Sequence, residues 1–214
     1  MFLEYREGVF TERFGQALAF AHELHRKQKR KTSGVPYVAH LLGVAALVIE
    51  DEGSEDEAIA ALLHDSLEDQ SRHYPGGEPA LAAEIEARFG EPVRRMVEAL
   101  TERRSPEESG IEDKRERWRV HKRAYFEQIK TAGPQVRRIS CADSVHNVRS
   151  LLKDYRRMGD RIWARFMTAR GDDQVWAYRA AAEAFQAAGA GPLAGELAEA
   201  VDALERAILP GAQI

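Results

Sequence analysis

Helix-forming residues dominate this chain, and this preference limits what it can fold into more than any other feature. Ala, Leu, Glu and Arg are abundant over its 214 residues, whereas runs in which β-branched residues alternate with polar ones are nearly absent. The abundant residues have high helix propensity, and the alternating pattern is the one typical of half-buried strands. We therefore predict an all-α fold, a compact bundle of many helices.

Capping residues and helix breakers mark where the predicted helices begin and end. Thr11 can cap the first helix, and Ser54 with Glu57 has the spacing of a capping box at the start of another. The predicted helices span about 11–29, a stretch from near 40, a stretch from 54 through 69, two stretches divided at 89–92, about 106–131, about 135–155, and two or three stretches between 159 and 214. No internal repeat or low-complexity linker interrupts the chain, so we predict a single domain over 1–214.

Composition excludes several classes of protein. The 31 Lys and Arg residues stand against 35 Asp and Glu residues, so no excess of positive charge indicates a nucleic-acid-binding protein. The one cysteine, Cys141, cannot form an internal disulfide, which fits a reducing compartment. Residues 1–7 do not resemble a secretory signal, and no apolar segment approaches the roughly 20 residues of a membrane span. We expect a cytoplasmic protein that binds neither nucleic acid nor a membrane.

The segment 64–69 concentrates the chemistry of the chain. It reads His-Asp-Ser-Leu-Glu-Asp and directly follows the apolar run 58–63. On a regular helix Glu68 lies about 40° from His64, Asp69 lies about 40° from Asp65, and all four side chains share an arc of about 140°. Three carboxylates in such an arc repel one another, and a bound metal ion neutralises them. The segment therefore predicts a metal site between helices, with spare groups for acid–base chemistry.

Two other stretches can add ligands to this site. His40 lies on an earlier predicted helix and Asp143 on a later one. Imidazole and carboxylate ligands without a thiolate suit Mn²⁺ or another borderline-hard divalent ion. Asn147 and Ser150 lie on the same helical stripe as Asp143, and an amide can hydrogen-bond a sugar or base without adding charge.

Each of these features also has an ordinary structural explanation. A single histidine such as His40 is more often a satisfied structural residue, and Glu68 with Asp69 alone is typical of a solvated helix face. Asp143 can form a surface ion pair with a nearby arginine. The metal site is favoured by the combination of an earlier histidine, the acidic segment and a later Asp-x-x-x-Asn.

The run 26–31 holds five cations in six residues. Such a run is usually a solvated helix end, where cations are favourable. Because it lies one loop away from His40, it can also meet the phosphates of a nucleotide. Nucleic-acid binding is a third interpretation, weakened by the lack of interleaved aromatic residues. His22 and His25 adjoin the run, and we expect a polar structural role for both.

Taken in order, the motifs of this chain resemble a known family. They are Ala-His at 21–22 before the basic run, Ser-Gly-Val-Pro-Tyr at 33–37 before His40, Ala-Ala-Leu-Leu-His-Asp at 60–65 with Glu-Asp at 68–69, Ile85 with Phe89 and Gly90, and Cys-Ala-Asp-Ser-Val-His-Asn-Val-Arg at 141–149. This order resembles the hydrolase domain of the RelA/SpoT alarmone enzymes, within the HD phosphohydrolase superfamily, and is closest in kind to the free-standing small alarmone hydrolases. The resemblance covers about 14–157 and leaves helices at about 159–214 beyond it.

The resemblance implies roles for individual residues. The residues implied to hold Mn²⁺ are His40, His64, Asp65 and Asp143. Glu68 and Asp69 are implied to position and deprotonate the attacking water. The residues implied to contact the nucleotide are Arg30, Lys31, Asn147 and Ser150. Leu41 stands where the family usually has proline and Ser144 where it usually has a basic residue, and neither departure removes a ligand.

The function implied by the resemblance is Mn²⁺-dependent hydrolysis of the 3′-pyrophosphate of (p)ppGpp-type alarmones, giving GDP or GTP and pyrophosphate. One alternative is a related phosphohydrolase acting on another nucleotide, such as a ppApp-type alarmone or the 2′-phosphate of NADPH. Another is a non-catalytic nucleotide sensor, which would have no need for Glu68 and Asp69. The expected partner is a nucleotide substrate, and the sequence leaves open whether the chain forms homo-oligomers.

Overall fold

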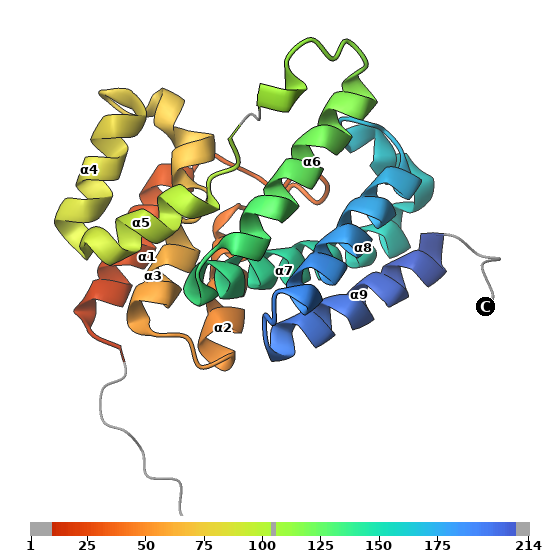
Figure 1. Ribbon diagram of the computed structural model, residues 1–214. Coiled ribbons are helices and arrows are strands. Elements are labelled where there is room, and N and C mark those ends of the chain that lie inside the picture. The colour runs from red at the N-terminus through yellow and green to blue at the C-terminus, as the bar shows by residue number, and fades with distance from the viewer. Residues whose placement is uncertain (1–9, 104–105, 209–214) are drawn as a thin grey trace, which may run out of the picture. The chain divides into compact units, whose positions relative to one another are not determined.

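The computed structural model describes residues 10–103 and 106–208, and these residues fold almost entirely into helices (Figure 1). The α-helices are α1 (Glu12–His25), α2 (Val38–Glu50), α3 (Glu55–Leu63), α4 (Gly77–Phe89), α5 (Glu91–Leu100), α6 (Lys114–Thr131), α7 (Pro134–Met158), α8 (Gly171–Ala187) and α9 (Pro192–Ile208). Shorter helical turns are η1 (Ser66–Gln70), η2 (Ser71–His73), η3 (Pro106–Glu108) and η4 (Gly159–Arg165). The described residues form no β-strand, so the predicted all-α class is confirmed.

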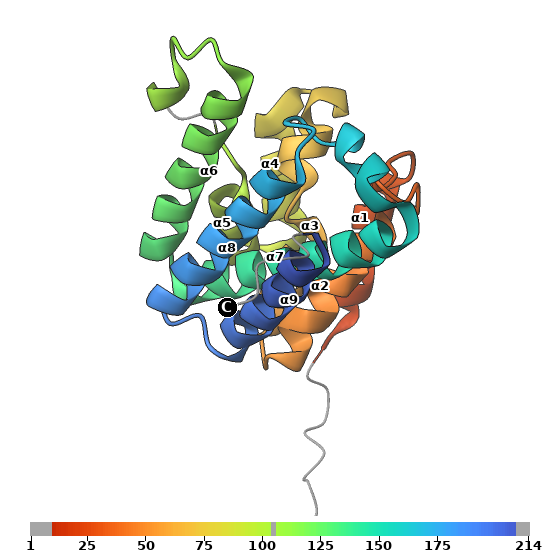
Figure 2. The same ribbon diagram turned by 90° about the vertical axis from the view of Figure 1, so that its right-hand side faces the viewer.

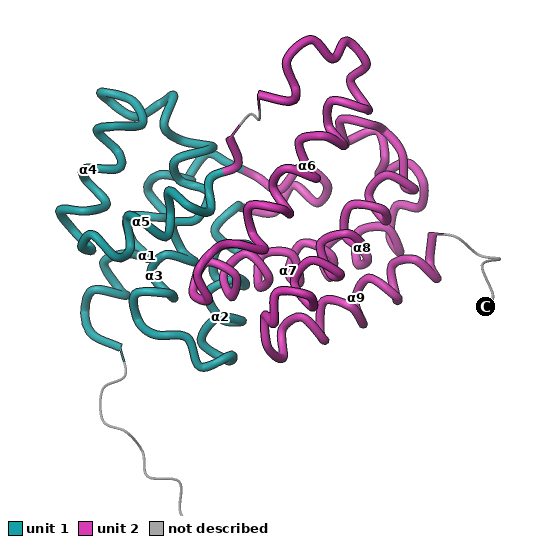
Figure 3. Tube along the Cα trace, viewed as in Figure 1, with its two compact units in different colours: residues 1–28, 37–101 teal, residues 29–36, 102–214 magenta. Residues whose placement is uncertain are grey.

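The chain divides into two compact units, coloured separately in Figure 3. The first unit contains residues 1–28 and 37–101, and the second contains residues 29–36 and 102–214. Helices α1 to α5 thus belong to the first unit, and α6 to α9 belong to the second. That the two units together make one domain stays a prediction.

Helix α3 forms the centre of the first unit. Its residues 58–63 are all fully buried, and it packs against α1, α2 and α5. A helix that is apolar on every side must be surrounded in this way. Its start is set locally, because Ser54 and Glu57 form the predicted capping box with reciprocal hydrogen bonds. Thr11 caps α1 as predicted, with its hydroxyl accepting from the backbone N–H of Arg13.

Helix α7 organises the second unit, and α6, α8 and α9 pack against it. Figures 1 and 2 both show α9 running alongside α7. At the start of α8, the buried Asp173 carboxylate accepts hydrogen bonds from Arg115 and Arg119 of α6. These bonds fasten α6 to α8 across more than fifty residues of chain, since the pairs are 58 and 54 residues apart.

Outside the segment 64–69, two predicted helix boundaries are wrong. The first helix ends at His25 rather than near residue 29. The stretch predicted as one helix over 106–131 is a short 3₁₀ turn, a loop and then α6 from Lys114. Gly110 has a φ of 82° in this loop, a conformation that cannot continue a right-handed helix. Asp113 then begins α6 anew, because its side chain accepts from the backbone N–H of Glu116.

None of the helices in the described part of the chain combines the length and the apolar character that crossing a bilayer requires. The prediction about residues 1–7 falls outside the described residues, as does the end of the predicted C-terminal helices at 209–214.

Candidate metal centre

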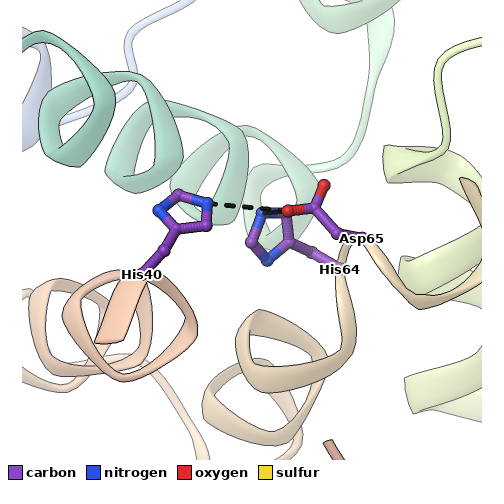
Figure 4. Close-up of side chains that lie close together, drawn as sticks. All are labelled: His40, His64 and Asp65. Carbon is purple, nitrogen blue, oxygen red and sulfur yellow. Dashed lines mark ion pairs between the residues drawn. The ribbon is translucent and has the colours of Figure 1, made fainter. Parts of the chain in front are cut away.

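Three of the four predicted metal ligands come together in the first unit. His40 lies on α2, and His64 and Asp65 follow directly after α3 (Figure 4). The His64 Nε2 atom lies 3.0 Å from Asp65 Oδ2, and the His40 Nε2 atom lies 3.5 Å from the same oxygen. One ligand atom from each residue lies within 4.8 Å of the others. Both histidines are buried, and the Asp65 side chain is 22% exposed, so the cluster is open on its carboxylate side.

The hydrogen bonding of His64 fits a metal ligand. Its Nδ1 atom lies 2.8 Å from the backbone carbonyl oxygen of Ala61, and a carbonyl can only accept, so the proton is on Nδ1. In the neutral ring, the Nε2 lone pair then points toward Asp65. A lone pair and a carboxylate oxygen 3.0 Å apart repel each other unless a proton or a metal ion lies with them. The donor set therefore suits a divalent cation.

Asp65 is ionised in this cluster. Burial on its own would raise the pKa of Asp65, but when the His64 ring carries a second proton, on Nε2, its charge and the hydrogen bonds from His40 and His64 hold that pKa well below its usual range. A carboxylate that stays ionised is the form that coordinates a cation.

Tyr37 supports the cluster from outside, although the sequence reasoning assigned it no role. Its hydroxyl donates a hydrogen bond of 2.6 Å to Asp65 Oδ2. Its ring meets that of His40 edge-on and stacks on that of His25, with ring centroids 5.3 Å apart in both pairs. The signals in the sequence are the place of Tyr37 at the end of the motif 33–37 and its spacing of three residues, about one helical turn, from His40.

The segment 64–69 does not continue α3, so its prediction as a regular helix is wrong. Helix α3 ends at Leu63, and Ser66–Gln70 forms a π-helical turn, η1, which packs against α1, α4 and α5. A π turn places more residues in each turn than an α-helix, so side-chain directions calculated at 100° per residue do not apply. Glu68 is exposed in this turn, whereas Asp69 is half-buried.

The half-buried Asp69 carboxylate is held by a glutamine that the sequence reasoning also missed. Gln28 donates from Nε2 to Asp69 Oδ2 at 2.6 Å, and the Oε1 atom of Gln28 lies 2.7 Å from Nδ1 of His25. His25 is buried, as a polar structural role would allow, and His22 is exposed. Burial lowers the pKa of His25, so its ring is neutral at neutral pH.

In the second unit, three of the predicted site residues form a hydrogen-bonded row. Arg30 donates to Asn147 Oδ1 at 2.6 Å, and Asn147 donates from Nδ2 to Asp143 Oδ1 at 2.7 Å. Asn147 and Asp143 lie one turn apart on α7, whereas Arg30 lies in the segment 29–36. Lys31 is exposed and Ser150 is half-buried on α7. The roles of all these residues, including Asp143 as a fourth ligand, stay predictions.

Comparison with known proteins places the chain in a family. The family model described as HD domain matches residues 17–172. The human protein named guanosine-3′,5′-bis(diphosphate) 3′-pyrophosphohydrolase MESH1 is 34% identical over 139 residues, which are 64% of this chain and 68% of the human protein. This chain belongs to the HD-domain hydrolases of the RelA/SpoT type. The predicted family and the prediction of an enzyme, a metal-dependent phosphohydrolase, are therefore confirmed, and an HD domain implies a divalent metal ion.

Two further similarities place this HD-domain chain among longer and shorter relatives. A guanosine-3′,5′-bis(diphosphate) 3′-pyrophosphohydrolase of Aquifex aeolicus is 44% identical over 91 residues, which are 42% of this chain but 12% of that protein. A solved structure titled as a metazoan ortholog of SpoT that hydrolyses ppGpp has a TM-score of 0.68, covering 94% of this chain and 98% of that one. At 22% sequence identity, the solved structure supports the fold alone.

Proposed function

We propose that this chain hydrolyses the 3′-pyrophosphate of (p)ppGpp-type alarmones, giving GDP or GTP and pyrophosphate, with Mn²⁺ as its metal ion. The observation that carries the proposal is the cluster of His40, His64 and Asp65, with the Asp69 carboxylate in the turn that follows it. The names of the human and Aquifex relatives support the choice of substrate.

The ligand chemistry supports manganese. Two imidazole nitrogens and a carboxylate, with no thiolate, suit Mn²⁺ better than a structural zinc ion. Asp143 is proposed as a fourth ligand, on the strength of the family resemblance. When bound, the ion supplies Lewis-acid polarisation of a phosphate oxygen and makes a neighbouring water more acidic.

In the proposed mechanism, the carboxylates of η1 handle the attacking water. Asp69 takes a proton from this water, with Glu68 beside it in the same turn to orient the water. The water oxygen attacks the phosphorus bonded to the 3′ oxygen of the ribose. The bond between that phosphorus and the 3′ oxygen breaks, the 3′ oxygen takes up a proton, and pyrophosphate leaves.

The second unit is proposed to bind the nucleotide. Arg30 offers a guanidinium that can meet phosphate oxygens bidentately, and Lys31 adds an exposed positive charge beside it. Asn147, already bonded to Arg30, offers an amide to the sugar or base, and Ser150 lies one turn further along α7. We also propose a cytoplasmic location, supported by Cys141, which as the one cysteine of the chain cannot form an internal disulfide.

A turnover assay tests the proposal. Purified protein with Mn²⁺ is given ppGpp, pppGpp, a ppApp-type alarmone and NADPH, and the release of pyrophosphate and orthophosphate is measured separately. We expect pyrophosphate from the guanosine alarmones. Release of orthophosphate only, or turnover of NADPH alone, contradicts the proposal.

Three variants separate chemistry from metal binding in the same assay. Glu68→Gln and Asp69→Asn are expected to lower kcat by about 100-fold or more while bound metal stays unchanged. His64→Ala is expected to lose the metal itself, because it removes a ligand. A wild-type rate in the Asp69→Asn variant would remove the carboxylate from the proposed mechanism.

A further inference from the structure

The Asp69 carboxylate is held at one oxygen by a neutral donor from a distant part of the chain. Gln28 donates from Nε2 to Asp69 Oδ2 at 2.6 Å, although the two residues are 41 positions apart. Among the described residues, no hydrogen bond to the other oxygen, Oδ1, is found. The carboxylate is thus fixed at Oδ2 and can use Oδ1 to accept a proton.

The orientation of the Gln28 amide follows from its surroundings. Asp69 can only accept in its ionised form, so the NH₂ group of Gln28 must face it. On the other side, the Oε1 atom of Gln28 then faces Nδ1 of His25 at 2.7 Å, which must carry the ring proton to donate to it. The Oε1 atom also accepts from the side-chain amide of Gln70, whose nitrogen lies 3.3 Å from Nδ1 of His25. A flipped amide would oppose donor to donor on one side and acceptor to acceptor on the other. His25 and Gln70 therefore hold Gln28 in the one orientation that serves Asp69.

The hydrogen bonds run in a single direction. The Ser66 hydroxyl lies 3.5 Å from Nε2 of His25, the His25 Nδ1–H donates to Gln28, and Gln28 donates to Asp69. A neutral imidazole has one donor and one acceptor nitrogen, which matches this order. Bonds aligned in this way polarise one another, so the last donor in the chain is strengthened.

Gln28 is also bonded through its backbone to Tyr37, the residue that supports the metal cluster. The backbone N–H of Tyr37 donates to the carbonyl oxygen of Gln28 at 3.0 Å, closing the segment 29–36. From this pair, the Tyr37 hydroxyl reaches Asp65 and the Gln28 amide reaches Asp69. The ring of His25 stacks on that of Tyr37, so both supports share one neighbour. The bonded pair Gln28 and Tyr37 thus fixes the position of the metal ligand Asp65 relative to the proposed base Asp69.

We propose that Gln28 is a positioning residue that holds the Asp69 carboxylate for water activation, with His25 and Gln70 orienting Gln28. This inference rests on the proposed function, since it assigns a helper to the base in that reaction. A neutral amide suits this role better than a cation, because the amide restrains the carboxylate without neutralising its charge.

The main test replaces the amide with an apolar side chain of nearly the same length. Gln28→Met keeps the volume and removes the donor. We expect kcat for alarmone hydrolysis to fall about 10- to 100-fold, because a general base loses its fixed position, while KM stays within about twofold. Metal content should stay at the wild-type level. A wild-type kcat, or a fall in kcat that only follows loss of metal, overturns the proposal.

A second variant tests whether the donated proton is what matters. Gln28→Glu keeps the shape, and the introduced carboxyl can donate to Asp69 only while it is protonated. Two adjacent carboxyls readily share one proton, so this variant should retain activity at low pH and lose it as pH rises. The wild type should show no such fall over the same range. A Gln28→Glu profile that parallels the wild type contradicts the proposal, and a merely structural role predicts no such pH dependence.

Gln186 supplies the matched control, because it is an exposed glutamine on α8 with no place in the proposed mechanism. Gln186→Met should leave kcat, KM and metal content unchanged. A fall in kcat equal to that of Gln28→Met would show that the loss is not specific to Gln28 and would overturn the proposal.

An NMR measurement separates this inference from the proposed function. If the wild-type protein hydrolyses none of the alarmones, the proposed function fails. The hydrogen bond from Gln28 to Asp69 can still be tested, because NMR detects it without any turnover. In ¹⁵N–¹H spectra, Asp69→Ala should shift the side-chain amide signals of Gln28 and leave those of Gln186 in place. Unshifted Gln28 signals would show that the bond does not form in solution and would end the inference.

Discussion

Removing one hydroxyl should measure how much Tyr37 contributes to the metal centre. Tyr37→Phe deletes the donor that lies 2.6 Å from Asp65 Oδ2 and keeps the ring that packs on His25 and His40. The bond is made to an ionised acceptor, and such bonds contribute about 1.5–3 kcal/mol. Groups that orient a metal ligand typically change metal affinity by about 10- to 100-fold, which is about 1.4–2.7 kcal/mol.

The assay is direct titration of metal-free protein with Mn²⁺, by calorimetry or by competition with a chelator of known affinity. We expect the Kd of Tyr37→Phe to rise by about 10- to 100-fold. Tyr155→Phe is the matched control, because its hydroxyl also donates to a carboxylate, that of Asp160, at 3.2 Å, and both residues belong to the second unit. The control should bind Mn²⁺ like the wild type. An unchanged Kd in Tyr37→Phe would refute the argument that Tyr37 orients the Asp65 ligand.

Three further predictions concern stability, each measured by urea unfolding. Asp173→Asn should lower the free energy of unfolding by about 1–3 kcal/mol, because it leaves two arginines of α6 facing a buried neutral group. Burial of Asp173 opposes its ionisation, but the hydrogen bonds and charges of the two arginines lower its pKa. The contribution of Asp173 to stability is therefore present above the ordinary Asp pKa and should be lost as pH falls through the lowered pKa. The hydrogen bond to Glu102 raises the pKa of His121, so the contribution of His121 to stability is full below the ordinary His pKa and should be lost as pH rises through the raised pKa. The difference in free energy of unfolding between wild type and His121→Gln should therefore shrink from about pH 5.5 to about pH 9. A difference that stays constant over this range contradicts the prediction. Leu62→Ala should cost about 2–5 kcal/mol, since Leu62 is fully buried in α3, and a cost under about 1 kcal/mol would mean that the core collapses around the gap.

Features that depend on neighbouring residues could be predicted from the sequence alone. The cap at Thr11 and the capping box of Ser54 and Glu57 form between residues two or three positions apart, so their spacing determined them. The all-α class follows from helix propensity summed over the whole chain. The sequence also predicts His40, His64 and Asp65 as metal ligands, because imidazole and carboxylate groups share one coordination chemistry.

The tertiary structure decided how the side chains of the site meet. Tyr37 reaches Asp65 across 28 positions and Gln28 reaches Asp69 across 41, and no local rule links residues so far apart. Helix α3 ends at Leu63 although the spacing of the side chains predicts one helix through residue 69, and the π turn that follows packs against three helices. Packing outweighs local propensity there, because propensity differs by less than about 1 kcal/mol per residue, whereas burying one large apolar side chain contributes about 1.5–3 kcal/mol.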